Sequence, residues 1–424
     1  MMGNAGRGWR VALLAVVSGG FGLLALAVAI SASAYAVLGP WMGRKDSDSP
    51  DPLGVFILAG ALAFVGVLMV AALYYAVRAL RREADRAAMG RPVGMWEASI
   101  LVLVWLASSI LAQMLLDQPP WRWLTPFLHV FAIAAPVYLL LKLAIGGIQG
   151  GSQLRLWGSL VTGLILGTGI AAAAELTLLG LAVSAGGLYL MLNPEQMHVL
   201  EGLVSQLGQT ARPQDALLII EPFLVRPLAF LFVLLAVSGV APVIEELAKS
   251  AAPWAIYDRL VTPAQGFWCG ALSGAGFALF EGLVASADAT DGWAFILLIR
   301  AASSMMHVLA SALAGWGIAA FRRGHRVTHL FGGYALAIGM HALWNAAVVA
   351  MAYGGLRLVI GGREMDMVGL ATVAAGALGL MTLLALLPIS LMLVNRSLRT
   401  AQAGSASQGL TEGPDAAAAA ALKG

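Results

Sequence analysis

Hydrophobic residues run along the chain in long blocks, which short polar segments interrupt. About ten of these blocks reach the ~20 residues that a helix needs to cross the apolar core of a bilayer. The pattern therefore predicts an all-α fold, a polytopic bundle of about ten transmembrane helices. The predicted spans are 9–38, 53–80, 97–116, 124–144, 157–190, 222–258, 266–287, 293–320, 329–354 and 367–393.

The composition supports a location inside a lipid bilayer. The chain is 60% hydrophobic and only 11% charged, whereas a soluble domain has roughly 25% charged residues. The net charge is +3, but the arginines gather in short loops beside the spans, so no nucleic-acid partner is expected. The single cysteine, Cys269, excludes an internal disulfide and a cysteine-based metal site.

The arginine-rich loops predict how the spans are oriented. One such loop follows the second span, around residues 78–91, and another lies near 321–329. By the positive-inside rule both loops are cytoplasmic. This places both termini in the cytoplasm if 222–258 crosses the membrane once, with a bend at Pro242.

Four segments follow from this pattern. Residues 1–192 form an N-terminal membrane region of about five spans, and 193–221 form an extracytoplasmic loop with one short helix. Residues 222–393 form a second membrane region, in which the motifs described below lie. The alanine-, glycine- and serine-rich residues 394–424 are expected to be a disordered cytoplasmic tail.

Ionisable residues lie inside several predicted spans. His129 in the fourth span and Arg300 in the eighth lie outside any motif and are interpreted as packing or pairing groups. The second region also carries Glu245, Glu246, Lys249 and Glu281. A charged side chain at the centre of a bilayer helix costs on the order of 2.5–3.5 kcal/mol, so the four together could cost on the order of 10 kcal/mol if unpaired. Such residues persist when they pair, line a wet cavity or take part in chemistry.

Helical spacing indicates which of these side chains share a face. Glu245 and Lys249 are four residues apart and can form a structural ion pair, whereas Glu246 points about 100° away from Glu245. His341 and Asn345 are also four apart and project from one face. With Glu281 and His307, these polar groups lie on four successive spans, which could converge around one small pocket.

The motifs formed by these residues resemble those of PrsW-type intramembrane proteases, relatives of the CAAX prenyl endopeptidases and the bacteriocin-processing membrane proteases. The similar motifs are EExxK at Glu245–Lys249, FAxxE at Phe277–Glu281, an isolated His307, and HxxxN at His341–Asn345. The resemblance covers roughly residues 241–346. It implies an endopeptidase of the bacterial cytoplasmic membrane that cuts a membrane-anchored protein. The catalytic set would be Glu245, Glu246, Glu281, His307, His341 and Asn345.

Two versions of the hydrolytic chemistry remain open. In the first, His307, His341 and Glu281 bind Zn²⁺, and Glu245 or Glu246 acts as the base toward the metal-bound water. In the second, a glutamate in apolar surroundings activates water without a metal, while His341 and Asn345 donate to the oxyanion. We favour the first, because two histidines and a carboxylate are a common catalytic zinc set.

Other functions would use the same residues differently. A proton-coupled transporter would relay protons through buried glutamates and histidines, and a non-catalytic membrane scaffold would keep the pocket without the reaction. A transporter more often has two symmetric halves with broken helices, whereas the polar residues of this chain lie in one half. The protease is therefore the preferred hypothesis.

Overall fold

The computed structural model of the chain describes residues 5–38, 51–118, 121–210, 216, 219–220, 223–287, 292–360 and 366–411. These residues include ten helical segments long and apolar enough to cross a membrane, which confirms the predicted all-α membrane fold. The ten segments are Gly8–Leu38, Pro52–Leu80, Met95–Leu115, Trp121–Ile145, Gln153–Leu192, Pro227–Ala255, Pro263–Ala285, Trp293–Gly324, Val327–Val359 and Met367–Gly404.

The described residues form two compact units, each built from chain segments that are distant in sequence. The first unit comprises Met1–Thr168, Lys249–Ala337 and Leu387–Gly424, and the second comprises Gly169–Ala248 and Ile338–Leu386. The predicted site residues fall into both units.

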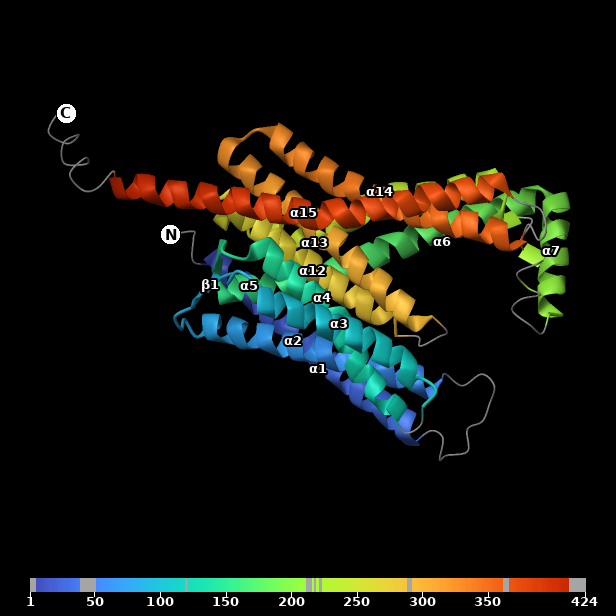
Figure 1. Ribbon diagram of the computed structural model, residues 1–424, viewed down its shortest axis with the longest axis horizontal. Helices are drawn as coiled ribbons and strands as arrows, with labels where there is room; N and C mark the ends of the chain where they lie inside the picture. The colour runs from blue at the N-terminus through green and yellow to red at the C-terminus, as the bar shows by residue number, and fades with distance from the viewer. Residues whose placement is uncertain are drawn as a thin grey trace. The chain divides into compact units, whose positions relative to one another are not determined.

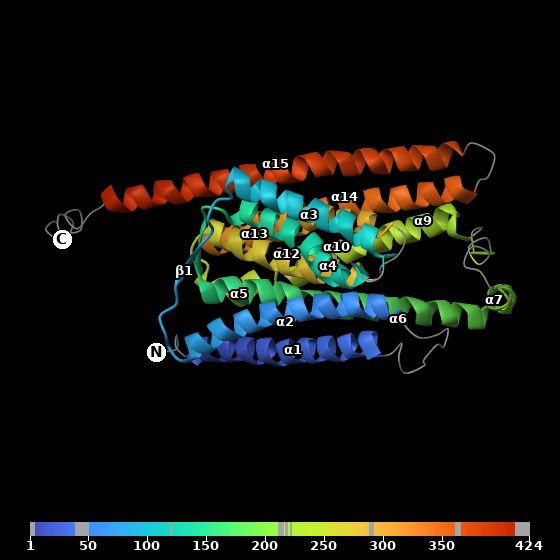
Figure 2. The same ribbon diagram turned by 60° about the horizontal axis from the view of Figure 1, so that its bottom comes forward.

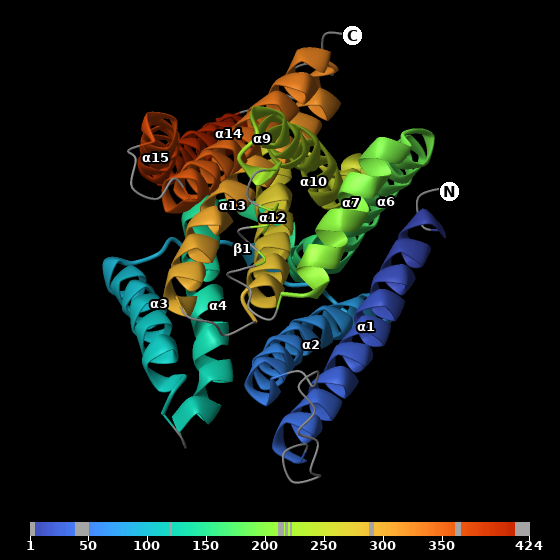
Figure 3. The same cartoon turned by 90° about the vertical axis from the view of Figure 1, so that its right-hand side faces the viewer.

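Two helix pairs form much of the first unit. Helices α1 (Ala5–Leu38) and α2 (Pro52–Leu80) lie side by side (Figures 1 and 2). Helix α3 (Met95–Leu115) lies beside α4 (Thr125–Ile145), which follows the 3₁₀ turn η2 (Trp121–Leu124) (Figure 3).

An ion pair ties the beginning of α1 to a loop far along the chain. The guanidinium of Arg10 donates to Asp258 at 2.7 Å, in the 3₁₀ turn η5 (Tyr257–Arg259). This hydrogen bond holds the pKa of the Asp258 carboxyl below its ordinary value. The carboxylate therefore stays ionised and keeps its partner.

A short antiparallel ribbon joins two loops of the first unit. Strand β1 (Ala87–Met89) pairs with β2 (Gln149–Ser152), with Ala87 opposite Ser152. The Ser152 hydroxyl accepts a hydrogen bond from the Arg155 N–H and caps α5 (Gln153–Val161). The π-helical turn η3 (Thr162–Gly167) follows α5 directly.

Helix α12 (Pro263–Ala285) forms the core of the first unit and is buried along most of its length. Its main neighbour is α13 (Trp293–Gly324). Gly266, Gly270 and Gly274 recur every four residues, and a Cβ at any of them would collide with the α13 backbone. The two helices can approach this closely because the glycines carry no side chain.

The second unit contains α6 (Thr168–Leu192), α7 (Pro194–Gly208), α9 (Pro227–Leu234), the π turn η4 (Leu235–Val240) and α10 (Ala241–Lys249). It also contains the later part of α14 (Val327–Ile360) and the first part of α15 (Met367–Thr411), which lie side by side (Figure 2). Tyr353 of α14 stacks on Phe230 of α9 with ring centroids 4.3 Å apart. This stacking contact holds α9 against α14.

The segment predicted to cross the membrane once between 222 and 258 contains one candidate span, Pro227–Ala255, with a turn at Ser250. It runs through α9, η4, α10 and α11 (Ala251–Ala255). The π turn η4 ends two residues before Pro242, the position at which a bend was predicted. A proline lacks the N–H that a regular α-helix requires at that point, and π turns are a common way to accommodate such a break.

The C-terminal segment differs from its prediction. Residues 394–411 were expected to be disordered, but α15 continues as a helix to Thr411. The Asn395 amide donates to the backbone carbonyls of Ala144 and Gly146, and Gln402 bonds to the backbone of Gln149. These hydrogen bonds order the first part of the expected tail, and residues 412–424 lie outside the described part. In the predicted loop 193–221, α7 is the expected short helix.

Candidate active site

Most of the predicted site residues belong to two polar groups, one in each unit. The Lys249 group consists of Lys249, Glu281, Arg300 and His307 and lies in the first unit. The His341 group consists of Glu245, Glu246 and His341 and lies in the second. Asn345 also lies in the second unit, one helical turn after His341.

His307 is the centre of the Lys249 group. Its Nδ1 lies 2.8 Å from the Lys249 Nζ, and its Nε2 lies 2.9 Å from the Glu281 carboxylate. Because an ammonium group only donates, Nδ1 accepts from Lys249. Nε2 then carries the proton and donates to Glu281, so this arrangement fits a neutral imidazole.

Glu281 is shared between His307 and a residue outside the predicted motifs. Its Oε1 accepts a hydrogen bond of 2.8 Å from Arg300, which the sequence identified only as an intramembrane polar residue. Arg300 and His307 are seven residues apart on α13, so they lie on the same helix face two turns apart. That spacing is the sequence signal that could have linked Arg300 to the site.

The serines near His307 bond mainly to the helix backbone. Ser303 and Ser304, which continue the polar stripe of His307 on α13, both donate to the carbonyl of Arg300, at 3.0 and 2.8 Å. Their hydroxyl protons are therefore used within α13. Arg300 and His307, rather than these serines, therefore contribute the α13 side chains of the described Lys249 group.

Lys249 is fully buried, and its ammonium is stabilised by more than His307. The Nζ lies 4.1 Å from the centroid of the Phe277 ring, a cation–π contact. The Ser273 hydroxyl donates to the Lys249 backbone carbonyl at 2.6 Å. Phe277, the first residue of the FAxxE motif, therefore supports the cation while Glu281 of the same motif binds the imidazole.

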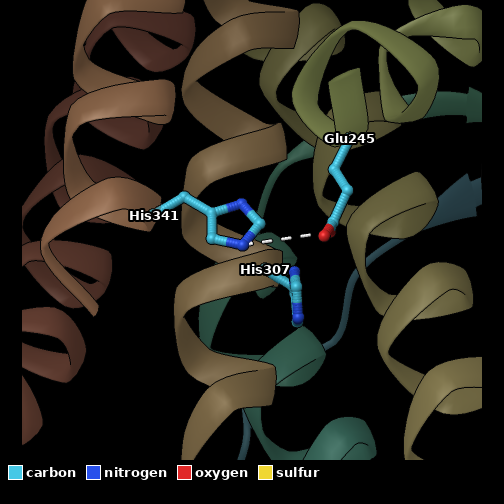
Figure 4. Close-up of side chains that lie close together, drawn as sticks. All are labelled: Glu245, His307 and His341. Atoms are coloured by element: carbon cyan, nitrogen blue, oxygen red, sulfur yellow. Dashed lines mark ion pairs between the residues drawn. The ribbon is translucent and has the colours of Figure 1, made fainter. Parts of the chain in front are cut away.

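His341 is the centre of the other group, between two adjacent glutamates. Its Nδ1 lies 2.9 Å from the Glu246 carboxylate, and its Nε2 lies 3.9 Å from Glu245 (Figure 4). Glu246 is fully buried, and the side chain of Glu245 is 14% exposed. An ionised Glu246 can only accept, so the proton of a neutral His341 is on Nδ1. The lone pair of Nε2 is thereby directed toward Glu245.

In both groups a carboxylate fixes one nitrogen of a histidine ring. Glu281 holds Nε2 of His307, and Glu246 holds Nδ1 of His341. Metal-binding histidines commonly donate their other ring N–H to a carboxylate in this way, which sets the tautomer and makes the ring more basic. The arrangement around each histidine is therefore that of a ligand with its supporting carboxylate.

Asn345 uses its amide within the second unit. Its Nδ2 donates to the backbone carbonyl of Val237 in η4 at 2.8 Å. In the π turn η4, the backbone N–H of Ala241 donates to the carbonyl of Ala236, five residues earlier. In the same register, the N–H of the next residue would donate to the carbonyl of Val237. That residue is Pro242, which has no N–H. Asn345 therefore satisfies a carbonyl that the proline leaves without a backbone donor.

Each group offers side chains that could be metal ligands, namely His307 in the first unit and Glu245 and His341 in the second. The sequence-based zinc set with Glu281 in place of Glu245 stays a prediction. Two imidazoles and one carboxylate are a typical catalytic zinc set. The His341 group also favours a divalent cation, because two carboxylates accompany one neutral imidazole.

His129 has a structural role outside these groups. Its Nε2 lies 2.8 Å from the Ser286 hydroxyl, which itself donates to the Gly282 carbonyl. The Ser286 oxygen therefore accepts from His129, and the imidazole joins α4 to the end of α12. This agrees with its interpretation from the sequence as a packing or pairing group.

Comparison with protein families finds one match. Residues 216–377 match the model of the PrsW family intramembrane metalloprotease. This confirms the resemblance inferred from the four motifs, all of which lie inside the matched segment. Comparisons with curated proteins and with solved structures find no match. Residues 1–215 and 378–424 lie outside the matched segment.

Proposed function

We propose that this PrsW-like intramembrane protease hydrolyses a peptide bond of a membrane-anchored protein, with Zn²⁺ as its cofactor. The observation that carries the proposal is the buried 2.9 Å contact between Glu246 and His341, with Glu245 facing the other ring nitrogen. The family match supports a protease in the membrane. The substrate class, the metal and the residue roles are our inference.

The proposed zinc ligands are Glu245, His307 and His341, the donor set described above. Bound there, zinc would supply a Lewis acid and lower the pKa of a coordinated water to about 7. Glu246 and Glu281 orient the two imidazoles through their hydrogen bonds. With Glu245 as a ligand, Glu246 is the carboxylate left to accept the proton of the attacking water and deliver it to the leaving amine.

Lys249 has a second role in this proposal. The single lone pair of His307 Nδ1 takes either the Lys249 ammonium, as in the described contact, or a metal ion. If His307 held a metal ion through Nδ1, the Lys249 ammonium would no longer be bound to that nitrogen. A buried cation close to the reacting carbonyl would stabilise the oxyanion. Lys249 is thus proposed to serve the transition state as well as the fold.

A reconstituted cleavage assay tests the proposed function. The full-length protein is placed in lipid vesicles with a single-span reporter protein that carries a different tag at each end. We expect cleavage by the wild type and its loss in His341→Ala. His198→Ala is the matched control and should cleave normally, because His198 lies in α7 with its side chain 78% exposed.

A second experiment, with a zinc chelator, tests whether the cleavage requires the metal. We expect a zinc chelator to stop cleavage and added zinc to restore it. Cleavage that continues in protein shown to be metal-free would overturn the zinc proposal and favour the glutamate mechanism. Reporter binding without cleavage by the zinc-loaded wild type would instead favour a non-catalytic scaffold.

A further inference from the structure

A cationic cavity lies in the first unit, away from both histidine groups. It has a volume of about 270 Å³ and lies between Pro92 and Val93, which precede α3, the end of α4 and the later part of α15. Lys142 of α4 and Arg396 and Arg399 of α15 contribute three cations to its lining. Neither the predicted motifs nor the proposed reaction uses this cavity.

The positive charge of the cavity exceeds the negative charge paired with it. Lys142 lies 3.0 Å from Glu97 of α3 and also faces the ring of Tyr138. Within the described ranges, no acidic side chain forms an ion pair with Arg396 or Arg399. Both arginines are exposed. Two positive charges therefore remain for an anionic ligand.

The wall of the cavity is held in a defined position. The buried Asn395 donates to the carbonyls of Ala144 and Gly146, which fixes α15 to the end of α4. Gly147 has a φ of +77°, and a Cβ there would lie against the Arg399 guanidinium. The arginine can lie along this backbone because the residue is glycine. The cations are therefore placed by the fold.

The other side of the cavity is apolar. Leu143 and Met392 line it together with the cations, and Met392 is 47% exposed. Lys142 lies in the last turn of α4, where the apolar span ends, and the exposed Trp96 lies at the start of α3. Tryptophan and the ends of spans mark the headgroup level of a bilayer. Cations there face phosphate groups, and apolar side chains beside them face acyl chains.

We propose that this cavity binds a phosphate-bearing anion, and that its source is the headgroup of an anionic phospholipid. The cations would pair with the phosphate oxygens, as basic pockets between transmembrane helices do. Leu143 and Met392 would contact the first part of an acyl chain. The cavity is then a lipid site that joins α4 to α15, independent of the proposed peptide-bond cleavage.

The test measures lipid binding to the full-length protein in detergent by native mass spectrometry. Phosphatidylglycerol and phosphatidylcholine are titrated into the wild type, into Arg396→Gln/Arg399→Gln and into Arg396→Lys/Arg399→Lys. The control is Arg81→Gln/Arg323→Gln, which removes two exposed arginines outside the cavity. A separate arm adds inorganic phosphate as a competitor.

We expect the wild type to prefer phosphatidylglycerol. The glutamine pair should weaken that binding about 30-fold, because each arginine near the membrane surface contributes about fivefold. The lysine pair should keep most of the affinity, and the control should match the wild type. Equal binding of the two lipids, or equal loss in the control, would overturn the proposal. Displacement of the lipid by millimolar phosphate would overturn the lipid source and leave a site for free phosphate.

Discussion

Asn345 donates a 2.8 Å hydrogen bond to the carbonyl of Val237, the carbonyl that Pro242 leaves without a donor in the π register. Asn345 is the last residue of the HxxxN motif, and Val237 lies eight residues before Glu245. The hydrogen bond therefore joins the helix that carries His341 to the turn that precedes the two glutamates. The described contact gives Asn345 a positioning role, whereas the metal-free version of the chemistry uses its amide as an oxyanion donor.

A double-mutant cycle tests this role. Asn345→Leu should lower the free energy of unfolding by about 0.5–2 kcal/mol, the range of hydrogen bonds between membrane helices. In a Pro242→Ala background the cost should fall toward zero, because an alanine at that position supplies the missing N–H. Thermal unfolding in detergent measures both costs. Equal costs in the two backgrounds would show that the proline and the asparagine are not coupled.

Glu246 is predicted to tune the metal affinity through His341. Glu246→Gln removes the negative charge that accepts the His341 Nδ1–H, and the loss of such a supporting carboxylate typically costs 10–100-fold in metal affinity or activity. We expect a loss of zinc affinity in that range, measured by competition with a zinc chelator of known affinity. Glu201→Gln is the matched control, because Glu201 lies exposed in α7. Unchanged zinc affinity in Glu246→Gln would contradict the prediction.

Arg300 is predicted to position Glu281, and through it His307. Arg300→Met removes the 2.8 Å hydrogen bond to Glu281, and we expect kcat/KM for reporter cleavage to fall about 10–100-fold. Arg300→Lys keeps the positive charge and should restore most of the activity. Arg323→Met, which removes an exposed arginine from the end of the same helix, should have no effect. If the lysine variant is as impaired as the methionine variant, the positive charge at this position does not determine the activity, and the prediction is wrong in that respect.

The glycines of α12 are predicted to be required for close packing on α13. In Gly270→Ala the new Cβ would collide with the Ser311 carbonyl, so a backbone must move. Overpacking of this kind costs typically about 1–3 kcal/mol, which should appear as a lower free energy of unfolding and reduced cleavage. Gly180→Ala in α6 is the control, since nothing lies within 4 Å of its added Cβ. A Gly270→Ala protein as stable as wild type would show that the interface can relax.

The spans could be predicted from the sequence because a bilayer imposes a length on every apolar block. The first predicted span, 9–38, matches Gly8–Leu38 almost residue for residue. The fifth was predicted as 157–190, whereas the helix begins at Gln153. Its first residues are partly polar, and the start is set by the Ser152 cap rather than by hydropathy.

The partners of the site residues were less predictable, because each partner lies on another helix. The carboxylate of Glu281, for example, accepts hydrogen bonds from Arg300 and His307, and the sequence did not predict the contact with Arg300. Which groups Glu281 meets depends on how closely the glycines of α12 let α13 approach. Hydropathy and spacing within one helix carry no information about that distance. The helical end of α15 was missed for a similar reason, since Asn395 and Gln402 bond to residues about 250 positions earlier.

The buried Lys249 has a consequence for how the protein enters the membrane. Phe277 and His307, which both contact its ammonium, come later in the chain, with His307 58 residues further on. A ribosome therefore delivers the lysine-bearing helix to the translocon before either of them has been made. A lysine at mid-bilayer costs about 2.5–3.5 kcal/mol. This cost is reduced if the helix enters the bilayer together with α12 and α13, which supply the contacts to the ammonium. We therefore expect this helix, α12 and α13 to insert into the membrane together, so that the lysine reaches its final position only after both later helices have been made.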